Sequence, residues 1–117
     1  LFIGNDGTLN VDRTNNYVGA TNQQNLRVAT ATPITMTAYD EVLVSNLSVA
    51  GAVAVTLPAS PTVGQRVTVK DGKGDAGANN ITVTPAAGNV DGSASHVLSS
   101  NYAVQTYAYN GTEWNKV

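Results

Sequence analysis

Strict alternation of apolar and polar residues is the feature that most constrains how this chain folds. In residues 66–70, Val67 and Val69 alternate with Arg66, Thr68 and Lys70. Successive side chains point to opposite faces only in an extended strand, so this period of two indicates a strand with one buried face. Runs of strand type recur at residues 34–38, 41–47, 52–57, 80–84, 95–98 and 103–109. The chain is therefore predicted to be all-β.

Glycine, proline and asparagine separate these runs, and no window of ten residues has a helical stripe free of Gly or Pro. We expect no helix longer than one turn. The side chains predicted to face the core are Val53, Val55, Leu57, Val67, Val69, Ile81 and Val83. Short strands separated by turns every 8–12 residues or so are typical of sandwiches and jelly rolls. Residues 34–117 are accordingly predicted to form a jelly-roll-like β-sandwich.

The chain ends in a predicted hairpin around Asn110-Gly111. This dipeptide favours a two-residue type I′ turn, because Asn and Gly tolerate positive φ at both central positions. Closure by two residues sets Tyr109 opposite Thr112, Tyr107 opposite Trp114, and Val104 opposite Val117. The prediction therefore includes a cross-strand aromatic pair between Tyr107 and Trp114, with Val104 and Val117 packed at the open end.

Residues 1–33 differ from the rest, since they hold six asparagines and few large apolar side chains. Such a segment buries too little surface alone to offset its ordering entropy. We expect an extended N-terminal arm that is either a flexible linker or ordered against other copies of the chain. Leu1 is interpreted as a cut or processing point of a longer protein.

The charge composition excludes several classes of partner. Only 12% of residues are charged, and six Lys and Arg against eight Asp and Glu leave a net charge of -2. A nucleic-acid-binding face needs a basic surplus, which this chain lacks. No apolar run approaches the ~20 residues of a membrane span. The absence of cysteine excludes disulfides and thiolate metal sites.

Candidate reactive groups are few, and each has a structural explanation. Residues 71–75 resemble a calcium loop only superficially, because Lys73 and Thr82 stand where an EF-hand needs oxygen ligands and a Glu. His96 is the single histidine, and its neighbour Ser95 points to the opposite strand face, which argues against a nucleophile and base pair. One alternative stays open, in which a threefold axis brings three copies of His96 together as a metal or anion site. We predict no enzyme, and no catalytic, cofactor or metal residues.

Trp114, with Tyr107 and Tyr109, suggests a sugar-stacking platform, since aromatic rings offer flat apolar faces. Core or interface packing is the favoured interpretation of Trp114. Tyr109, beside the turn, is the more exposed candidate. A carbohydrate-binding module is therefore kept as one alternative function.

From Leu57 onward, five blocks in order resemble a module of bacteriophage virion proteins. They are residues 57–71 with the run Leu-Pro-Ala-Ser-Pro, the glycine-rich residues 72–78, Asn-Asn-Ile-Thr-Val at 79–83, Val-Asp-Gly-Ser at 90–93, and Tyr-Asn-Gly-Thr-Glu-Trp at 109–114. The resemblance covers roughly residues 34–117. This segment is similar to the C-terminal β-sandwich knobs of tail fibres, tail needles, head fibres and capsid decoration proteins.

The resemblance implies a homotrimeric structural protein on the exposed surface of a virion. Residues 1–33 lie outside the resemblance, and we interpret them as an arm that joins the knob to a shaft or particle. Its implied partners are other copies of itself, other virion proteins and a host-surface glycan or protein. Receptor contact is predicted in loops 72–80 and 86–95, through Asp75, Asn79, Asn89 and Asp91, with Tyr109 beside them. A capsid decoration protein that stabilises the head is the second alternative function.

Overall fold

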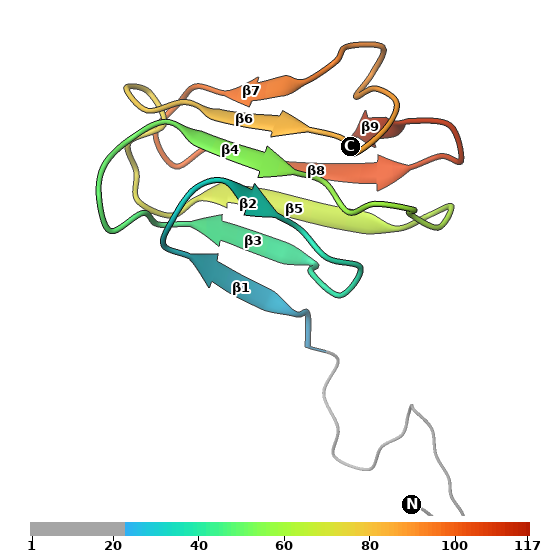
Figure 1. Cartoon of the computed structure of the whole chain (residues 1–117), viewed down its shortest axis with the longest axis horizontal. Helices are drawn as coiled ribbons and strands as arrows, with labels where there is room; N and C mark the ends of the chain where they lie inside the picture. The colour runs from blue at the N-terminus through green and yellow to red at the C-terminus, as the bar shows by residue number, and fades with distance from the viewer. Residues whose placement is uncertain (1–22) are drawn as a thin grey trace, which may run out of the picture.

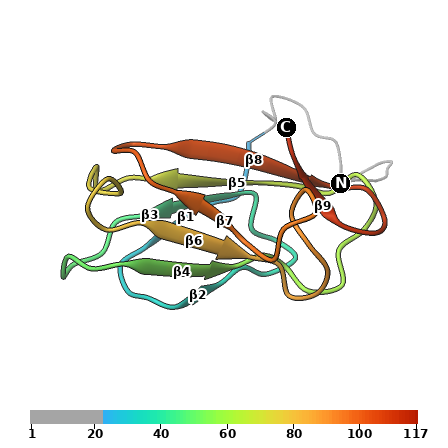
Figure 2. The ribbon, with the colours of Figure 1, turned by 90° about the horizontal axis from the view of Figure 1, so that it is seen from above.

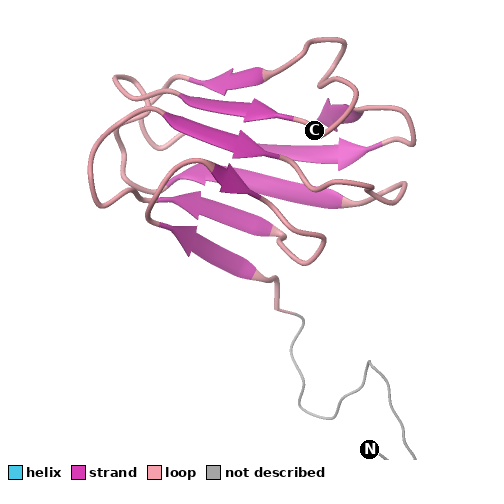
Figure 3. Cartoon of the chain, in the orientation of Figure 1, coloured by secondary structure: helices cyan, strands magenta, loops and turns pink. Residues whose placement is uncertain are grey.

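A computed structural model of the chain describes residues 23–117, and within them it contains nine strands and no helix (Figures 1 and 3). The strands are β1 (Leu26–Ala29), β2 (Ile34–Thr35), β3 (Val42–Ser45), β4 (Val53–Thr56), β5 (Arg66–Asp71), β6 (Ile81–Thr84), β7 (His96–Leu98), β8 (Val104–Tyr109) and β9 (Trp114–Lys116). The predicted all-β class is confirmed. The expectations for residues 1–22, including the processing point at Leu1, lie outside the described residues.

The strands form two mixed sheets that face each other as two layers (Figure 2). One sheet has the order β1-β3-β5-β8-β9, and the other has the order β2-β4-β6-β7. The side chains between them make one apolar core. Every side chain predicted from the alternation to face inward is buried there: Val53, Val55, Leu57, Val67, Val69, Ile81 and Val83. The sandwich-like layering expected from the sequence is therefore present.

The path of the chain through these layers is a winding one. From β1 to β6 each strand lies in the sheet opposite to the strand before it, and it pairs in parallel with the strand two places earlier. Leu26 is level with Val42, and Val42 is level with Thr68. Three coils are thus stacked in parallel. Strands β7, β8 and β9 then turn back and pair antiparallel.

This winding differs from the expected jelly-roll arrangement, in which strands pair antiparallel through Greek-key connections. Alternation within one strand reports which side chains are buried but carries no information on the direction of the neighbouring strand. The parallel direction follows from the connections, because each links one sheet to the other rather than closing a hairpin.

The winding also sorts the loops between two ends of the molecule. We call them the Tyr102 end, with residues 30–33, 46–52, 72–80 and 99–103, and the Tyr39 end, with residues 36–41, 57–65, 85–95 and 110–113. The Tyr102 end lies on the left of Figure 1. Each strand runs from one end to the other, so consecutive loops lie at opposite ends.

The boundary expected at residue 33 is not a structural boundary. Leu26–Ala29, placed in the N-terminal arm by the sequence, form β1 and pair with β3. The sequence signal was weak because β1 has only four residues and follows the polar run at 22–25.

The terminal hairpin exists, but its predicted register is wrong by two residues. Tyr109 pairs with Trp114 and Tyr107 with Lys116, so the loop contains four residues, 110–113. Gly111 has a φ of 101°, whereas Asn110 is not in the left-handed region that a type I′ turn requires. The Asn110 side-chain Oδ1 instead accepts hydrogen bonds from the backbone N–H groups of Thr112 and Glu113.

The observed register changes which side chains of the hairpin lie next to each other. The aromatic pair is Tyr109 with Trp114, at a centroid distance of 5.4 Å, rather than Tyr107 with Trp114. Val104 and Val117 are both exposed and do not pair, because the Val117 N–H donates to the carbonyl of Thr106.

Candidate functional site

The two loops expected to share a receptor lie at opposite ends of the molecule. Loop 72–80 precedes β6 and loop 86–95 follows it, so the four residues of β6 separate them. Asp75 and Asn79 are at the Tyr102 end, whereas Asn89, Asp91 and Tyr109 are at the Tyr39 end. The candidate contact residues therefore form two separate groups.

At the Tyr39 end, loop 86–95 is bound to β9 by backbone hydrogen bonds. The Trp114 N–H donates to the carbonyl of Asn89 at 3.0 Å, and the Asp91 N–H donates to the carbonyl of Trp114 at 3.0 Å. The Asp91 carboxylate accepts a further hydrogen bond from Asn115 Nδ2 at 3.0 Å. Asn89 and Asp91 thus cover the outer edge of β9, and the Asp91 carboxylate is occupied in doing so.

Trp114 is only 1% exposed and Tyr107 is fully buried, so neither ring is available for sugar stacking. Tyr109 is half-buried against the same core. The favoured interpretation of Trp114 as a core residue is confirmed. The aromatic platform suggested for these three residues is not a surface feature.

His96, on β7, contacts the buried Tyr107 across the core. Its Nδ1 lies 2.8 Å from the Tyr107 hydroxyl, and the two rings meet edge to face at 5.9 Å. Burial lowers the pKa of His96, and the positive charge of Lys116 lowers it further against the opposing effect of Asp91. Burial also raises the pKa of Tyr107. Both groups are therefore neutral near pH 7, in a polar pair that links the two sheets.

At the Tyr102 end, the carboxylate of Asp71 organises the loops. Asp71 ends β5 and is 2% exposed. Its oxygens accept hydrogen bonds from the N–H groups of Gly74 at 3.0 Å, Ala76 at 2.9 Å and Tyr102 at 3.0 Å. One buried side chain therefore fixes both loop 72–80 and loop 99–103.

Burial by itself raises the pKa of the Asp71 carboxyl, but these backbone donors outweigh it and hold the pKa below its ordinary value. Asp71 is therefore ionised near pH 7. Its negative charge is compensated by N–H dipoles rather than by a cation, which explains how a charged group lies at the end of the core.

Asp75 and Asn79 bond to each other within loop 72–80. Asn79 Nδ2 donates to Asp75 Oδ2 at 2.9 Å, and the Asn79 N–H donates to the Asp75 carbonyl at 2.8 Å. Asp75 is half-exposed and lies at the surface of the Tyr102 end. Both residues shape this loop. Gly74 of the same loop contacts Tyr102, for which no role was predicted.

Tyr102 is 61% exposed. Its ring lies over Gly74 at the tip of loop 72–80, because a Cβ on Gly74 would come within 2.3 Å of the Tyr102 ring. Lys70 Nζ is 5.3 Å from the ring centroid and donates to the Tyr102 carbonyl at 2.6 Å. The only signal in the sequence was an aromatic residue within a polar turn, and tertiary contacts with residues about 30 positions away were needed to distinguish it.

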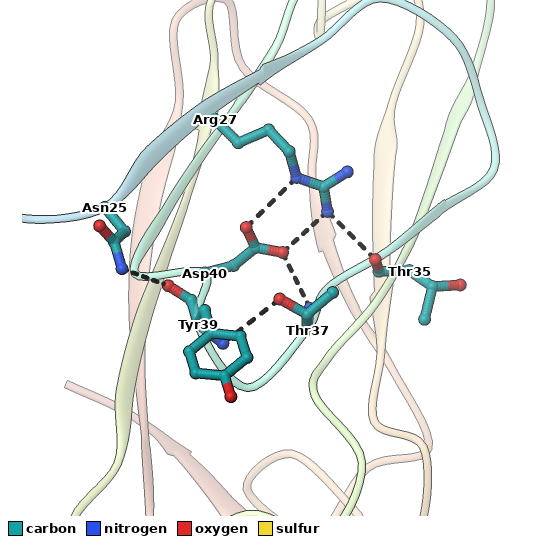
Figure 4. A network of polar contacts seen from close by, with 6 residues as sticks. All are labelled: Asn25, Arg27, Thr35, Thr37, Tyr39 and Asp40. Carbon is teal, nitrogen blue, oxygen red and sulfur yellow. Dashed lines mark hydrogen bonds and ion pairs between the residues drawn. The ribbon is translucent and has the colours of Figure 1, made fainter.

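A polar network closes the first coil at the Tyr39 end (Figure 4). Arg27 extends from β1 to β2 of the opposite sheet, where Nη2 donates to the Thr35 carbonyl at 3.1 Å. The same nitrogen donates to Asp40 Oδ2 at 2.8 Å, in the loop that follows β2. The Thr37 N–H donates to the same oxygen at 2.8 Å. Burial raises the pKa of Asp40, but the Thr37 and Arg27 hydrogen bonds and the charge of Arg27 together lower it below its ordinary value.

No metal centre or membrane span emerges from the described residues. In residues 23–117 no three His, Cys, Asp or Glu side chains are placed to hold a metal ion. The same residues contain no helix long and apolar enough to cross a membrane. His96 is committed to Tyr107 rather than to a cluster of ionisable groups.

Known proteins add no assignment to this geometry. The chain matches no protein-family model and no curated protein.

Proposed function

We propose that this chain is a structural component of a bacteriophage virion, a homotrimeric fibre or knob domain used in host-surface attachment. The observation that carries the proposal is the ordered set of residue blocks from Leu57 to Trp114 that resembles virion knob modules. These blocks follow one another along the chain, from the loop before β5 through β6 to the β8–β9 hairpin.

An uncharged apolar strip on the outer face of the larger sheet supports the proposal of self-association. Leu26 and Val28 of β1 are 58% and 53% exposed. They are level with Val42 and Val44 of β3, which are half-buried on the same face. Packing these strips of identical copies together would remove apolar surface from water, with Lys70 of β5 bordering the strip beside Val44.

Attachment by this trimer would work through avidity. Three identical sites on one rigid particle make the second and third contacts intramolecular, so weak individual sites suffice for stable retention. The low charge of the chain fits this assembly, because unpaired charges buried between copies would be costly.

Sedimentation of the purified chain tests the assembly. We expect a species of three times the 12.1 kDa of one chain. The double variant Leu26→Glu/Val28→Glu should dissociate it, because six carboxylates would then be buried at the interface. The control Val49→Glu replaces another exposed apolar side chain, in a loop away from the strip, and should leave the trimer intact. A stable monomer of the unmodified chain would contradict the trimer.

Binding to host cells and to emptied capsids separates attachment from capsid decoration, the alternative role in the same class of protein. Retention by cells supports attachment. Retention by emptied capsids alone would contradict host attachment and indicate capsid decoration instead.

A further inference from the structure

Tyr102 combines an exposed ring with a firmly held backbone. Its N–H donates to the buried Asp71 carboxylate at 3.0 Å, and its carbonyl accepts from Lys70 Nζ at 2.6 Å. The side chain is nevertheless 61% exposed. The main chain is therefore anchored on both sides of a ring that remains in solvent.

The backbone conformation of Tyr102 is disfavoured for this residue type. Its φ is 61°, in the left-handed region that Gly and Asn adopt readily and aromatic residues rarely do. Packing of the core does not require the ring, because most of it lies outside the core. Strained residues held in place by their surroundings are concentrated at ligand-binding and catalytic sites.

Loop 72–80 supports the ring from one side. Gly74 leaves room for it, since a Cβ there would lie 2.3 Å from the Tyr102 Cζ atom. The Gly77 N–H donates to Asn101 Oδ1 at 2.9 Å and ties this loop to the one that carries Tyr102. Asp71 bonds to both loops. The ring therefore has a fixed position before any ligand arrives, which reduces the entropy cost of binding.

The loop that carries this ring is rich in hydroxyl and amide side chains, and the Lys70 ammonium lies over the ring, 5.3 Å from its centroid. Ser99, Ser100 and Asn101 immediately precede Tyr102 and are exposed. Asn101 uses its Oδ1 for Gly77, while its Nδ2 has no hydrogen-bond partner among the described residues. A flat aromatic face beside such groups matches a sugar ring, whose C–H face packs on the aromatic ring and whose hydroxyls exchange hydrogen bonds with amides and hydroxyls.

We propose that Tyr102 is a stacking platform for a sugar ring of a surface glycan, with Ser100 and Asn101 at its rim. The inference rests on the proposed attachment function and gives the chemical class of its ligand. A protein-binding hot spot gathers aromatic and apolar anchors in a desolvated pocket. The residues that precede Tyr102 on its loop are polar instead, and this favours a glycan over a protein.

The test is retention of the full chain on an array of purified bacterial polysaccharides and of oligosaccharides of glucose, galactose and N-acetylglucosamine. We expect binding to at least one of these probes. Tyr102→Phe keeps the ring and should retain binding within about threefold. Tyr102→Asn removes the ring and should lower the affinity at least tenfold, the factor that corresponds to about 1.4 kcal/mol.

The unfolding temperatures of the same variants show whether a loss of binding reflects a loss of folding. Asn accepts a positive φ better than Tyr, so Tyr102→Asn should unfold at the same temperature as the unmodified chain or higher. The matched control is Tyr39→Ala, which removes a 79% exposed tyrosine at the other end and should leave binding unchanged.

The platform would be overturned if the unmodified chain retained no glycan, if Tyr102→Asn retained glycan equally well, or if Tyr102→Asn were markedly destabilised, which would make the ring structural. Cell retention that depends on Tyr102 without any glycan binding would indicate a protein receptor and would also overturn it. Glycan binding by a monomeric chain would leave the platform standing while the trimer fails. Cell retention insensitive to Tyr102 would leave the attachment function standing while the platform fails.

Discussion

At the scale of single residues, the buried polar side chains determine how this protein responds to its surroundings. His96 and Tyr107 form a neutral pair between the sheets, and Asp71 is a charged group held by backbone N–H donors. The neutral pair becomes charged when its imidazole is protonated. The Asp71 carboxylate is protonated only at much lower pH. The two groups therefore act in separate ranges of pH.

Protonation of His96 should destabilise the fold below neutral pH. Burial lowers its folded pKa beneath the unfolded value of about 6.5, so the unfolded chain binds the proton more tightly. The free energy of unfolding should be constant above about pH 7.5 and fall as the pH drops through about 6.5, by less than about 1.4 kcal/mol per pH unit. It should level off once the folded-state pKa is passed. Urea titrations from pH 8 to pH 5 measure this.

His96→Asn should abolish this slope between pH 7.5 and 5, because carboxyl groups titrate mainly below this range. A variant with the same slope as the unmodified chain would show that the dependence has another origin.

Residue-scale features were the least predictable from the sequence. The burial of Val67, Val69 and Ile81 followed from local alternation alone. The role of Asp71 did not, because its donors lie three, five and 31 residues away and meet it only after the coils have stacked. Tyr102 was missed for the same reason, since its support comes from Gly74 on another loop.

At the scale of elements, the β8–β9 hairpin illustrates what turn chemistry can and cannot fix. The Asn-Gly pair located the turn correctly, but it did not determine the loop length. The Asn110 side chain accepts two backbone N–H groups and stabilises a four-residue loop in place of the two-residue turn. The four-residue loop also brings Trp114 level with Tyr109, so that both rings pack at the core. Burial of aromatic surface favours this register over local propensity.

Gly111→Ala should destabilise this hairpin. The φ of 101° at Gly111 is strained for any residue with a Cβ, and the added methyl would lie 3.2 Å from Val63 Cγ2. We expect a loss of about 1–3 kcal/mol in the free energy of unfolding, measured by urea denaturation. Gly51→Ala is the matched control, because its Cβ meets no atom within 4 Å and its φ is not positive. Equal effects of the two substitutions would contradict this explanation.

At the scale of the whole molecule, the stacked coils differ in how well their edges are covered. Residues 89–91 cover the outer edge of β9. No described strand covers the outer edge of β1, so the first coil depends on the Arg27 network and on its pairing with β3. In stacked coils each unit is stabilised mainly by its neighbours, so the first coil should open before the others.

Arg27→Ala should therefore loosen the first coil selectively. We expect amide hydrogen exchange in β1, β2 and residues 37–42 to accelerate by roughly tenfold, equivalent to about 1.4 kcal/mol. Exchange in β5, β6 and β8 should be unchanged. Arg66→Ala removes an exposed arginine from β5 and serves as the control. Uniform acceleration throughout the chain would instead indicate that the fold opens as a single unit.

The sorting of loops by the winding has a consequence for how such a protein can vary. Residues inserted in loop 46–52 or loop 72–80 lengthen only the Tyr102 end, because the adjoining strands keep their register and the opposite end keeps its own loops. The shape and chemistry of one end can thus change by insertion or exchange of loops without altering the loops of the other end. The two ends of the molecule are in this sense independently variable.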